Sequence, residues 1–331
     1  MIRKTIAAIV AGAAALSLAS CKPAAPDQTL NFSIASAEDQ ASMQKVWQPL
    51  LDDLNTQTGL HVVPHFASNY TSQIEAMQFN QVQLGWFPAL STLQAVRRAD
   101  GEVLGRVVGD NGAGQQYESV IIVKKGSNIT LDDVLKCGKR YSFGLGDPES
   151  TSGTLAPMAY VFIPHNIDLQ DCFSVVREAN HQANLFAVAN GVVDVATNNT
   201  IGLIFARREH PEMADKVQVI WTSPPLPESS IVVRKDLDPA TKAKLKDFFV
   251  RYGTAQGAEG EHERAVLKGL AYGGFRDADI GYLDPVAEMV ASQDLVTAKK
   301  SGDPAKIAAA QKAYDDEMAE IAAHKKAAPA S

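Results

Sequence analysis

The sequence has no excess of positive charge. Its 31 Lys and Arg residues face 38 Asp and Glu residues, so the formal net charge at pH 7 is -7. No run rich in Lys or Arg occurs apart from the tail around Lys325 and Lys326. This balance excludes nucleic acid as a partner. Any anion that the protein binds must be held by local geometry.

Motifs for catalysis and for metal or nucleotide binding are also missing. The seven histidines show no metal-ligand spacing, and no G-x-S-x-G nucleophile motif occurs. No G-x-x-x-x-G-K-[ST] loop is present, and the run GLGDPE lacks the third glycine of a dinucleotide fingerprint. A phosphate-ester enzyme would need a metal cluster or a nucleophile with a base. We therefore expect a protein that is not an enzyme and that has no metal and no cofactor.

Long hydrophobic runs are absent as well. The apolar stretch from Thr5 to Ser20 follows a positively charged start and is too short and too rich in alanine for a membrane span. It predicts an export signal over residues 1–20. Cys21 follows in the pattern L-A-S-C, which resembles the bacterial lipoprotein signal, in which the cysteine is acylated after cleavage. Residues 21–29, rich in Pro and Ala, would then form a tether to a membrane.

Two locations are compatible with this segment. The favoured one is a lipid-anchored protein on the periplasmic or cell-surface side of a bacterial membrane, with Cys21 as the anchor. The alternative is an ordinary secreted protein in which the cysteine occurs by chance.

Cysteine is scarce in the rest of the chain, which holds only Cys137 and Cys172. An exported protein can form disulfides, and a bridge here would close a loop of roughly 35 residues. In the chain-entropy model such a loop contributes about 3 to 4 kcal/mol to stability. The alternative is two buried free thiols, because a sequence does not contain the distance between two Cα atoms.

Alternating strand and helix patterns fill the middle of the chain. TLNFSIAS near residue 30 predicts a strand, and strands and helices alternate from there to about residue 99. A second series begins near Tyr117 and ends with the strand VQVIW at 217–221. From about Pro224 the pattern becomes helical. Such alternation predicts an α/β fold in which mainly parallel sheets are flanked by helices.

The two series predict two lobes. Lobe 1 would comprise residues 30–115 and 225–331, and lobe 2 would comprise residues 116–224, with two crossover segments between them. Ligands of such folds bind at the carboxyl ends of strands, in the cleft between lobes.

The C-terminal segment carries an apolar stripe at helical spacing. The stripe consists of Ile307, Ala310, Tyr314, Met318 and Ile321. We expect this helix to pack on the first lobe, and a homodimer formed through the helix is the alternative.

The loop GDPESTSG, residues 146–153, contains three consecutive hydroxyl residues, Ser150, Thr151 and Ser152. They fall at the expected N-terminus of a helix, where free N–H groups and the helix dipole attract anions. The hydroxyls add further donors, and Gly153 allows close approach of the backbone. This pattern predicts a site for a tetrahedral oxyanion. The alternative is simple helix capping, for which one hydroxyl is enough.

Three separate segments resemble the periplasmic phosphonate- and phosphite-binding proteins of bacterial ABC importers. The segments are GDPESTSGTLAPMAYVF, NHQANLFAVANGVVDVATNNT and VIWTSPPLP, and the likeness extends in register from NFSIAS to about residue 275. The resemblance implies a two-lobed, type II-like periplasmic-binding-protein fold. It also implies that the lobes close on a small phosphorus oxyanion and present it to an ABC permease. A sensor that signals to a membrane partner would have the same pocket and is the alternative.

The resemblance also implies roles for individual residues. The hydroxyl triplet at 150–152 matches the family's oxyanion-binding residues. Two tyrosines match phenols that reach the ligand, and one histidine matches a pocket residue that hydrogen-bonds an oxygen. These residues are Tyr70, Tyr117 and His181. Without the resemblance, core or hinge packing would explain them.

The sequence also departs from the family pattern. Members that bind aminoethylphosphonate carry a glutamate after V-A-T-N-N-T and an aspartate in the second crossover, where this chain has Ile201 and Ser229. Phe87 follows Trp86 where relatives often have tyrosine, so we expect both to form a less polar pocket floor. An ammonium group facing Ile201 would be costly to desolvate. The expected ligand is therefore phosphite or a short alkylphosphonate rather than an aminophosphonate, unless a shifted crossover brings Glu228 into the site.

Overall fold

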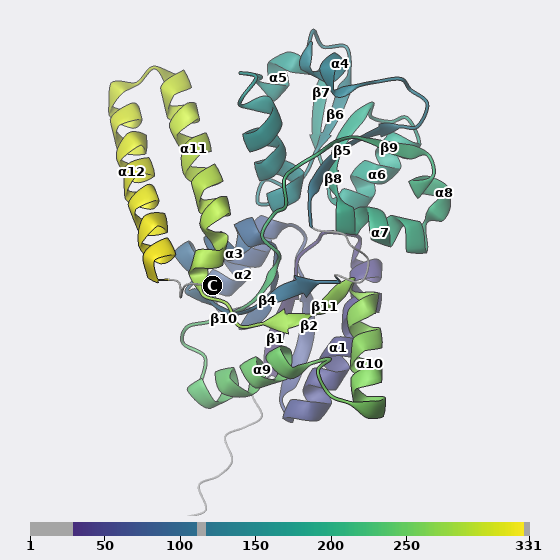
Figure 1. Cartoon of the computed structure of the whole chain (residues 1–331), viewed down its shortest axis with the longest axis vertical. Coiled ribbons are helices and arrows are strands. Elements are labelled where there is room, and N and C mark those ends of the chain that lie inside the picture. Colours follow the sequence, from purple (N-terminus) through teal and green to yellow (C-terminus); the bar gives the residue numbers. More distant parts are fainter. Residues whose placement is uncertain (1–28, 111–116, 328–331) are drawn as a thin grey trace, which may run out of the picture.

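The computed structural model describes residues 29–110 and 117–327, and its strands form two sheets, each flanked by helices (Figure 1). The predicted signal, Cys21 and nearly all of the predicted tether lie outside the described residues. Thr29, the last residue of that tether, already belongs to the first strand, because it pairs with His61. Among the described residues, no helix combines the length and the apolarity needed to cross a bilayer.

The first sheet, which we call lobe 1 together with its helices, has the strand order β11-β4-β10-β3-β1-β2. Its strands are β1 (Thr29–Ile34), β2 (His61–Phe66), β3 (Leu84–Phe87), β4 (Gly101–Gly109), β10 (Ser230–Arg234) and β11 (Tyr272–Arg276). The helices of this part are α1 (Gln40–Thr58), α2 (Tyr70–Gln78), α3 (Ala89–Arg98), α9 (Pro239–Arg251) and α10 (Gly257–Gly269).

The second sheet, which we call lobe 2 together with its helices, has the order β7-β6-β8-β5-β9. Its strands are β5 (Ser119–Lys124), β6 (Ser142–Leu145), β7 (Val175–Glu178), β8 (Val195–Asn199) and β9 (Val217–Thr222). The α-helices are α4 (Leu131–Leu135), α5 (Leu169–Cys172), α6 (His181–Ala189), α7 (Thr200–Glu209) and α8 (Pro211–Ala214). Two π-helical turns, η2 (Thr151–Leu155) and η3 (Met158–Phe162), form a continuous helical segment after β6.

Both sheets are mixed, which differs from the expected mainly parallel sheets. Parallel pairs join β1 to β2 and β3, and β6 to β7 and β8. The strand that the chain forms on arriving from the other lobe, β5 or β10, runs antiparallel to both of its neighbours. The chain enters β5 and β10 from the cleft between the lobes, so these two strands run away from the cleft. The strands that lead into helices run towards the cleft and end beside it, which makes the two groups antiparallel. Hydrophobic periodicity missed β4, β10 and β11, which are paired only with strands distant in sequence.

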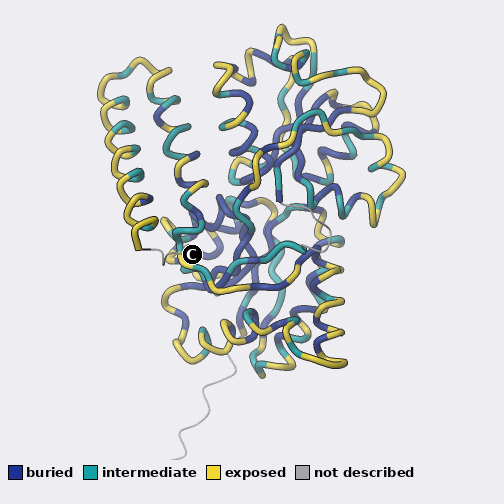
Figure 2. Tube along the Cα trace, in the orientation of Figure 1, coloured by how far each residue is buried: buried dark blue, intermediate teal, exposed yellow. Residues whose placement is uncertain are grey.

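Both lobes have buried cores along their sheets (Figure 2). In lobe 1, Phe32 of β1 and Trp47 of α1 lie at the centre of a cluster, with their ring centroids 5.5 Å apart. Helix α1 is capped by the Asp39 side chain, which accepts from the N–H groups of Ala41 and Ser42. Gly59 ends it at a φ of 68°, a left-handed conformation that favours glycine.

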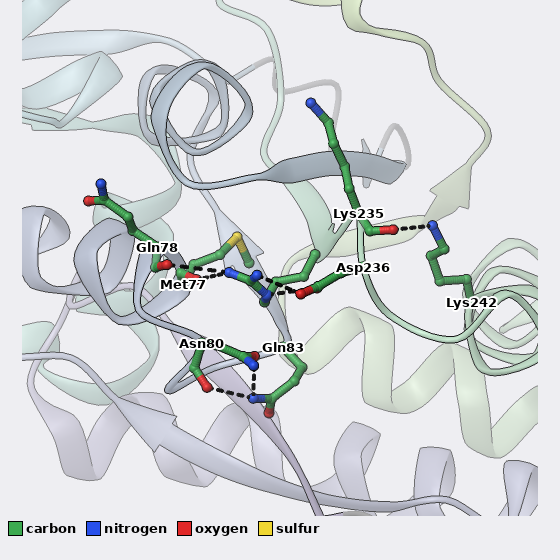
Figure 3. A network of polar contacts seen from close by, with 8 residues as sticks. Met77, Gln78, Asn80, Gln83, Lys235, Asp236 and Lys242 are labelled. Atoms are coloured by element: carbon green, nitrogen blue, oxygen red, sulfur yellow. Dashed lines mark hydrogen bonds and ion pairs between the residues drawn. The ribbon is translucent and has the colours of Figure 1, made fainter.

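A buried arginine joins β10 to α2 (Figure 3). The Arg234 guanidinium donates to the Met77 carbonyl oxygen at 2.5 Å and forms an ion pair with Asp236 at 2.7 Å. The Met77 carbonyl oxygen also accepts from the Asn80 N–H at 3.1 Å, so the guanidinium adds a further donor at the end of α2. The contact ties the end of β10, which the chain forms after it returns from lobe 2, to helix α2.

Cys137 and Cys172 form a disulfide in lobe 2, with their Cα atoms 4.4 Å apart. The bridge links the end of α5 to the segment that follows α4, and the Lys139 N–H donates to the Cys172 carbonyl oxygen beside it at 2.8 Å. Both cysteines were predicted as a possible pair, and the fold brings their separate helices together.

The C-terminal helices bridge the lobes rather than packing on lobe 1 alone. After the short η4 (Ile280–Leu283), α11 (Asp284–Ser301) and α12 (Pro304–Ala327) form a hairpin beside lobe 2 (Figure 1). Helix α11 contacts α3 of lobe 1 and also η2 and η3 of lobe 2. Met318 and Ile321, from the predicted stripe on α12, pack in the same cluster as the first residues of α3. These two residues of the stripe therefore pack against other parts of the same chain.

Candidate functional site

A cavity lies between the lobes, lined by residues of both. Six of the residues predicted from the sequence line it: Tyr70, Trp86, Tyr117, His181, Ile201 and Ser229. The cavity wall also includes Asn199, Glu38, Glu228, Trp47 and Tyr272, which were not among the predicted site residues. The fold thus gathers residues from both lobes and from both crossover segments.

Four helices begin at this cavity. Tyr70 and His181 are the first residues of α2 and α6, and Pro88 and Asn199 are the N-cap residues of α3 and α7. Helix N-termini carry partial positive charge, and their first N–H groups have no partner inside the helix. Each of these helices follows the carboxyl end of a strand, which explains why their starts meet at one place. The convergence brings the N-termini of four helices to one cavity in a protein whose net charge is negative.

The three hydroxyl residues lie just behind the cavity wall, and each has a distinct role. The Ser150 hydroxyl caps the helical segment by accepting from the Gly153 N–H at 3.0 Å. The Thr151 hydroxyl oxygen accepts from the Leu90 N–H of α3 at 2.8 Å, across the lobes. Capping therefore explains Ser150, whereas Thr151 connects the lobes.

Ser152 is the member of the triplet that organises the cavity wall. Its hydroxyl oxygen accepts from the Tyr117 hydroxyl at 2.9 Å and from the Asn199 amide at 3.2 Å. His181 Nε2 lies 3.5 Å from the same oxygen. The Ser119 hydroxyl holds the Ser152 carbonyl at 2.6 Å. Three polar side chains that line the cavity thus converge on one buried hydroxyl.

His181 is held uncharged. Its side chain is buried, and burial lowers its pKa to about 4. A neutral imidazole has one N–H to donate and one nitrogen to accept. Within the described residues Nδ1 has no hydrogen-bond partner, so one ring nitrogen is free for a ligand. The backbone N–H of His181 donates to the Ala37 carbonyl at 3.1 Å, which fixes the start of α6 against lobe 1.

Two carboxyl groups line the cavity, and neither was among the predicted site residues. Burial, with a smaller contribution from Asp39, raises the pKa of Glu38 to about 8, and burial raises that of Glu228 to about 7. Glu228 precedes Ser229 in the second crossover, and the structure brings this carboxyl group to the cavity, as the shifted-crossover alternative required. Glu38 follows the carboxyl end of β1, and this position was the only feature of the sequence that indicated a place in the cavity wall.

Phe87 does not line the cavity, which corrects the sequence-based expectation. It is fully buried beside Ile74, Met77 and Val82 on the other side of the lobe 1 sheet. Successive side chains of a strand point to opposite faces, so only Trp86 faces the cavity. The aromatic floor consists instead of Trp86 with Trp47 and Tyr272, and the two indole centroids lie 5.5 Å apart.

Direct hydrogen bonds hold the lobes together around the cavity. The Tyr70 N–H donates to Asp147 at 3.0 Å, and the Asp39 N–H donates to the Gln182 side chain at 2.9 Å. With the bond from Leu90 to Thr151, these contacts connect the loop 146–153 and α6 of lobe 2 to helix starts of lobe 1. The elements that form the polar wall of the cavity therefore also carry contacts between the lobes.

Comparison with known proteins identifies similar chains. A family model described as the periplasmic substrate-binding protein of phosphonate ABC transporters matches residues 32–281. The phosphonates-binding periplasmic protein of Escherichia coli K12 is 40% identical over 276 residues, which is 83% of this chain and 80% of that protein. The phosphate-import protein PhnD of Mycolicibacterium smegmatis is 28% identical over 250 residues, which is 71% of this chain and 75% of that protein.

A solved structure is also similar. The binding-protein component of an ABC phosphonate transporter from Pseudomonas aeruginosa is 35% identical, with a TM-score of 0.83, and the match covers 91% of this chain and 97% of that chain.

Proposed function

The chain belongs to the family of periplasmic phosphonate-binding proteins of ABC transporters, which bind substrates and are not enzymes, and we propose that it holds the phosphorus-oxygen group of its ligand where four helices begin. The convergence of α2, α3, α6 and α7 on one cavity is the observation that carries this proposal. Ser152, Tyr117, Asn199 and His181 would supply neutral hydrogen bonds to the oxygens. In a site closed to water such neutral dipoles hold an anion well.

We propose further that the ligand carries a non-ionic substituent, as in phosphite or a short alkylphosphonate. Ile201 on the first turn of α7 offers an ammonium group no acceptor, and Ser229 offers no charge. Glu228 argues against this preference, because its carboxyl group also lines the cavity and can pair with an ammonium group. With a pKa of about 7, it is partly protonated at neutral pH and is then a weak counter-charge.

The same proposal includes the export of the protein, its anchoring to a membrane and the delivery of its ligand. Residues 1–20 would direct export, Cys21 would be lipidated and residues 21–29 would act as the tether. The lobes, with boundaries near residues 115 and 225, would close on the ligand and present it to an ABC permease. A sensor that signals to a membrane partner is the alternative. Homodimerisation through α12 has no support from the packing, because Met318 and Ile321 are used within the chain.

Calorimetric titration with phosphite, methylphosphonate, 2-aminoethylphosphonate and phosphate tests the proposed preference. We expect phosphite or methylphosphonate to bind at least about 10-fold more tightly than the aminophosphonate, since an ammonium group that loses water without full compensation costs more than 1.4 kcal/mol. Stronger binding of the aminophosphonate would assign the ammonium to Glu228 and refute the non-ionic preference. Failure of all four ligands would refute phosphorus-oxyanion capture itself.

The substitution Ile201→Glu is expected to raise the affinity for 2-aminoethylphosphonate by about 10-fold, because a carboxylate on the first turn of α7 would pair with the ammonium. The same change is expected to weaken methylphosphonate binding. The conservative change Ile201→Val, titrated in parallel, controls for altered packing. An Ile201→Glu variant that gains nothing for the aminophosphonate would contradict the role given to this position.

A further inference from the structure

An apolar chamber adjoins the ligand cavity between the lobes. Its walls come from α1 of lobe 1 and from α6 and α7 of lobe 2. Five residues border both hollows: Glu38, Met43, Val46, Gly202 and Phe205. The chamber therefore lies directly behind these side chains, on the side of the cavity where α7 begins.

One face of α7 runs along both hollows. Ile201 lines the ligand cavity, Phe205 borders both, and Ala206 lines the chamber. Residues four apart lie above one another on a helix face, so the Ile201 side chain leads to that of Phe205 one turn later. Opposite them, Met43 and Val46 of α1 belong to both walls. Apolar side chains of two helices, one from each lobe, thus lie between the ligand cavity and the chamber.

Polar groups surround the far end of the chamber. Lys45 of α1 and Glu209 of α7 form an ion pair across the lobes at 2.5 Å, and Gln182 hydrogen-bonds His210 at 3.2 Å. All four residues line the chamber. The Lys45 and Glu209 side chains are exposed to solvent, whereas Leu185 and Ala206 are buried. The chamber consequently has an apolar interior and a charged rim, which is the arrangement of a pocket for an apolar group.

Glu38 is the ionisable group at the boundary between the two hollows. Burial raises its pKa to about 8, so its carboxyl group is mostly protonated at neutral pH. An uncharged carboxyl group loses little when an alkyl chain lies against it, whereas a carboxylate would lose its hydration. The other charged side chains of the chamber, Lys45 and Glu209, are paired with each other at the rim.

We propose that this chamber binds an unbranched alkyl chain longer than methyl, carried on the phosphorus of an alkylphosphonate ligand. The proposal rests on the proposed function, because it requires the phosphorus-oxygen group to sit at the helix N-termini next to Ser152. Ile201 then lies beside the first carbons of the chain, and the later carbons pass Met43 and Phe205 to reach Leu185 and Ala206. The site selects the substituent by the apolar area that it buries.

Titration of the whole chain with methylphosphonate and butylphosphonate tests this inference. Each fully buried methylene tightens binding by about four-fold, so three additional methylenes give on the order of 50-fold. If butylphosphonate binds no more tightly than methylphosphonate, the chamber proposal is overturned while the proposed function stands. If neither ligand binds, both proposals fail.

A filling substitution locates the effect. Ala206→Leu is expected to remove most of the butylphosphonate advantage and to leave methylphosphonate affinity unchanged. Ala214→Leu is the matched control, because Ala214 packs on the same lobe 2 cluster and lines neither hollow. Equal losses for both ligands in Ala206→Leu would overturn the assignment to this chamber. Melting temperatures identify a variant that fails to fold, and the chain-length comparison in the unsubstituted protein then decides alone.

Discussion

Replacing Ser152 by alanine is expected to weaken methylphosphonate binding by about 100-fold. The Ser152 hydroxyl accepts from Tyr117 and Asn199 and lies 3.5 Å from His181 Nε2. Its removal leaves two buried donors without their acceptor and withdraws a donor from the oxyanion. A hydrogen bond to a charged group contributes about 1.5 to 3 kcal/mol, and an unsatisfied buried donor costs a similar amount. The unsatisfied donors are present with and without ligand, so the lost hydrogen bond to the oxyanion sets the change in affinity, at most about 3 kcal/mol or about 100-fold.

Calorimetry on the Ser152→Ala variant measures this loss. Ser33→Ala is the matched control, because Ser33 is equally buried in β1, does not line the cavity, and its hydroxyl has no partner within the described residues. We expect that control to keep its affinity. Thermal unfolding without ligand separates the two roles of Ser152, since a purely structural residue would change stability and leave the affinity of the folded protein intact. Unchanged affinity in Ser152→Ala would disprove the assignment of this hydroxyl.

Glu38→Gln is expected to remove a large part of the pH dependence of folding. Burial raises the pKa of Glu38 from 4.5 to about 8. The contribution of this group to stability is complete below pH 4.5 and is lost as the pH rises towards 8, because only the unfolded chain ionises readily in that range. The slope is at most about 1.4 kcal/mol per pH unit. Between pH 5 and pH 8 the unsubstituted protein should lose about 4 kcal/mol more than the variant.

Urea unfolding at pH 5 and pH 8 measures this difference. Glu228 changes stability in the same direction as Glu38, since its pKa is also raised, to about 7. His181 acts in the opposite direction: its pKa of about 4 means that stability falls as the pH drops below 6.5. Both groups are present in the variant, so they cancel in the comparison. Glu75→Gln, at an exposed position of α2, is the control. Parallel pH profiles for the Glu38→Gln variant and the unsubstituted protein would show that Glu38 is not buried in its neutral form.

The hydroxyl pattern and the family resemblance together predicted much of the polar wall. The hydroxyl triplet, Tyr117 and His181 were identified from the chain and from its family resemblance, and the structure brings the polar atoms of Ser152, Tyr117 and His181 together. The role of each hydroxyl was not predictable. A pattern of three hydroxyls at a helix start does not show which hydroxyl caps the helix, which one bonds to α3 and which one accepts hydrogen bonds from the cavity residues.

The sequence by itself determined the class of fold and the type of ligand group, because these depend on local periodicity and on recognisable motifs. Only the tertiary structure decided which side chains of a strand face the cavity, and it turned Phe87 away from it. It also brought Glu38 and Glu228 to one cavity from crossover and loop segments far apart in the chain. Burial and charge state arise from such distant contacts, so the character of the cavity was set by packing between the lobes.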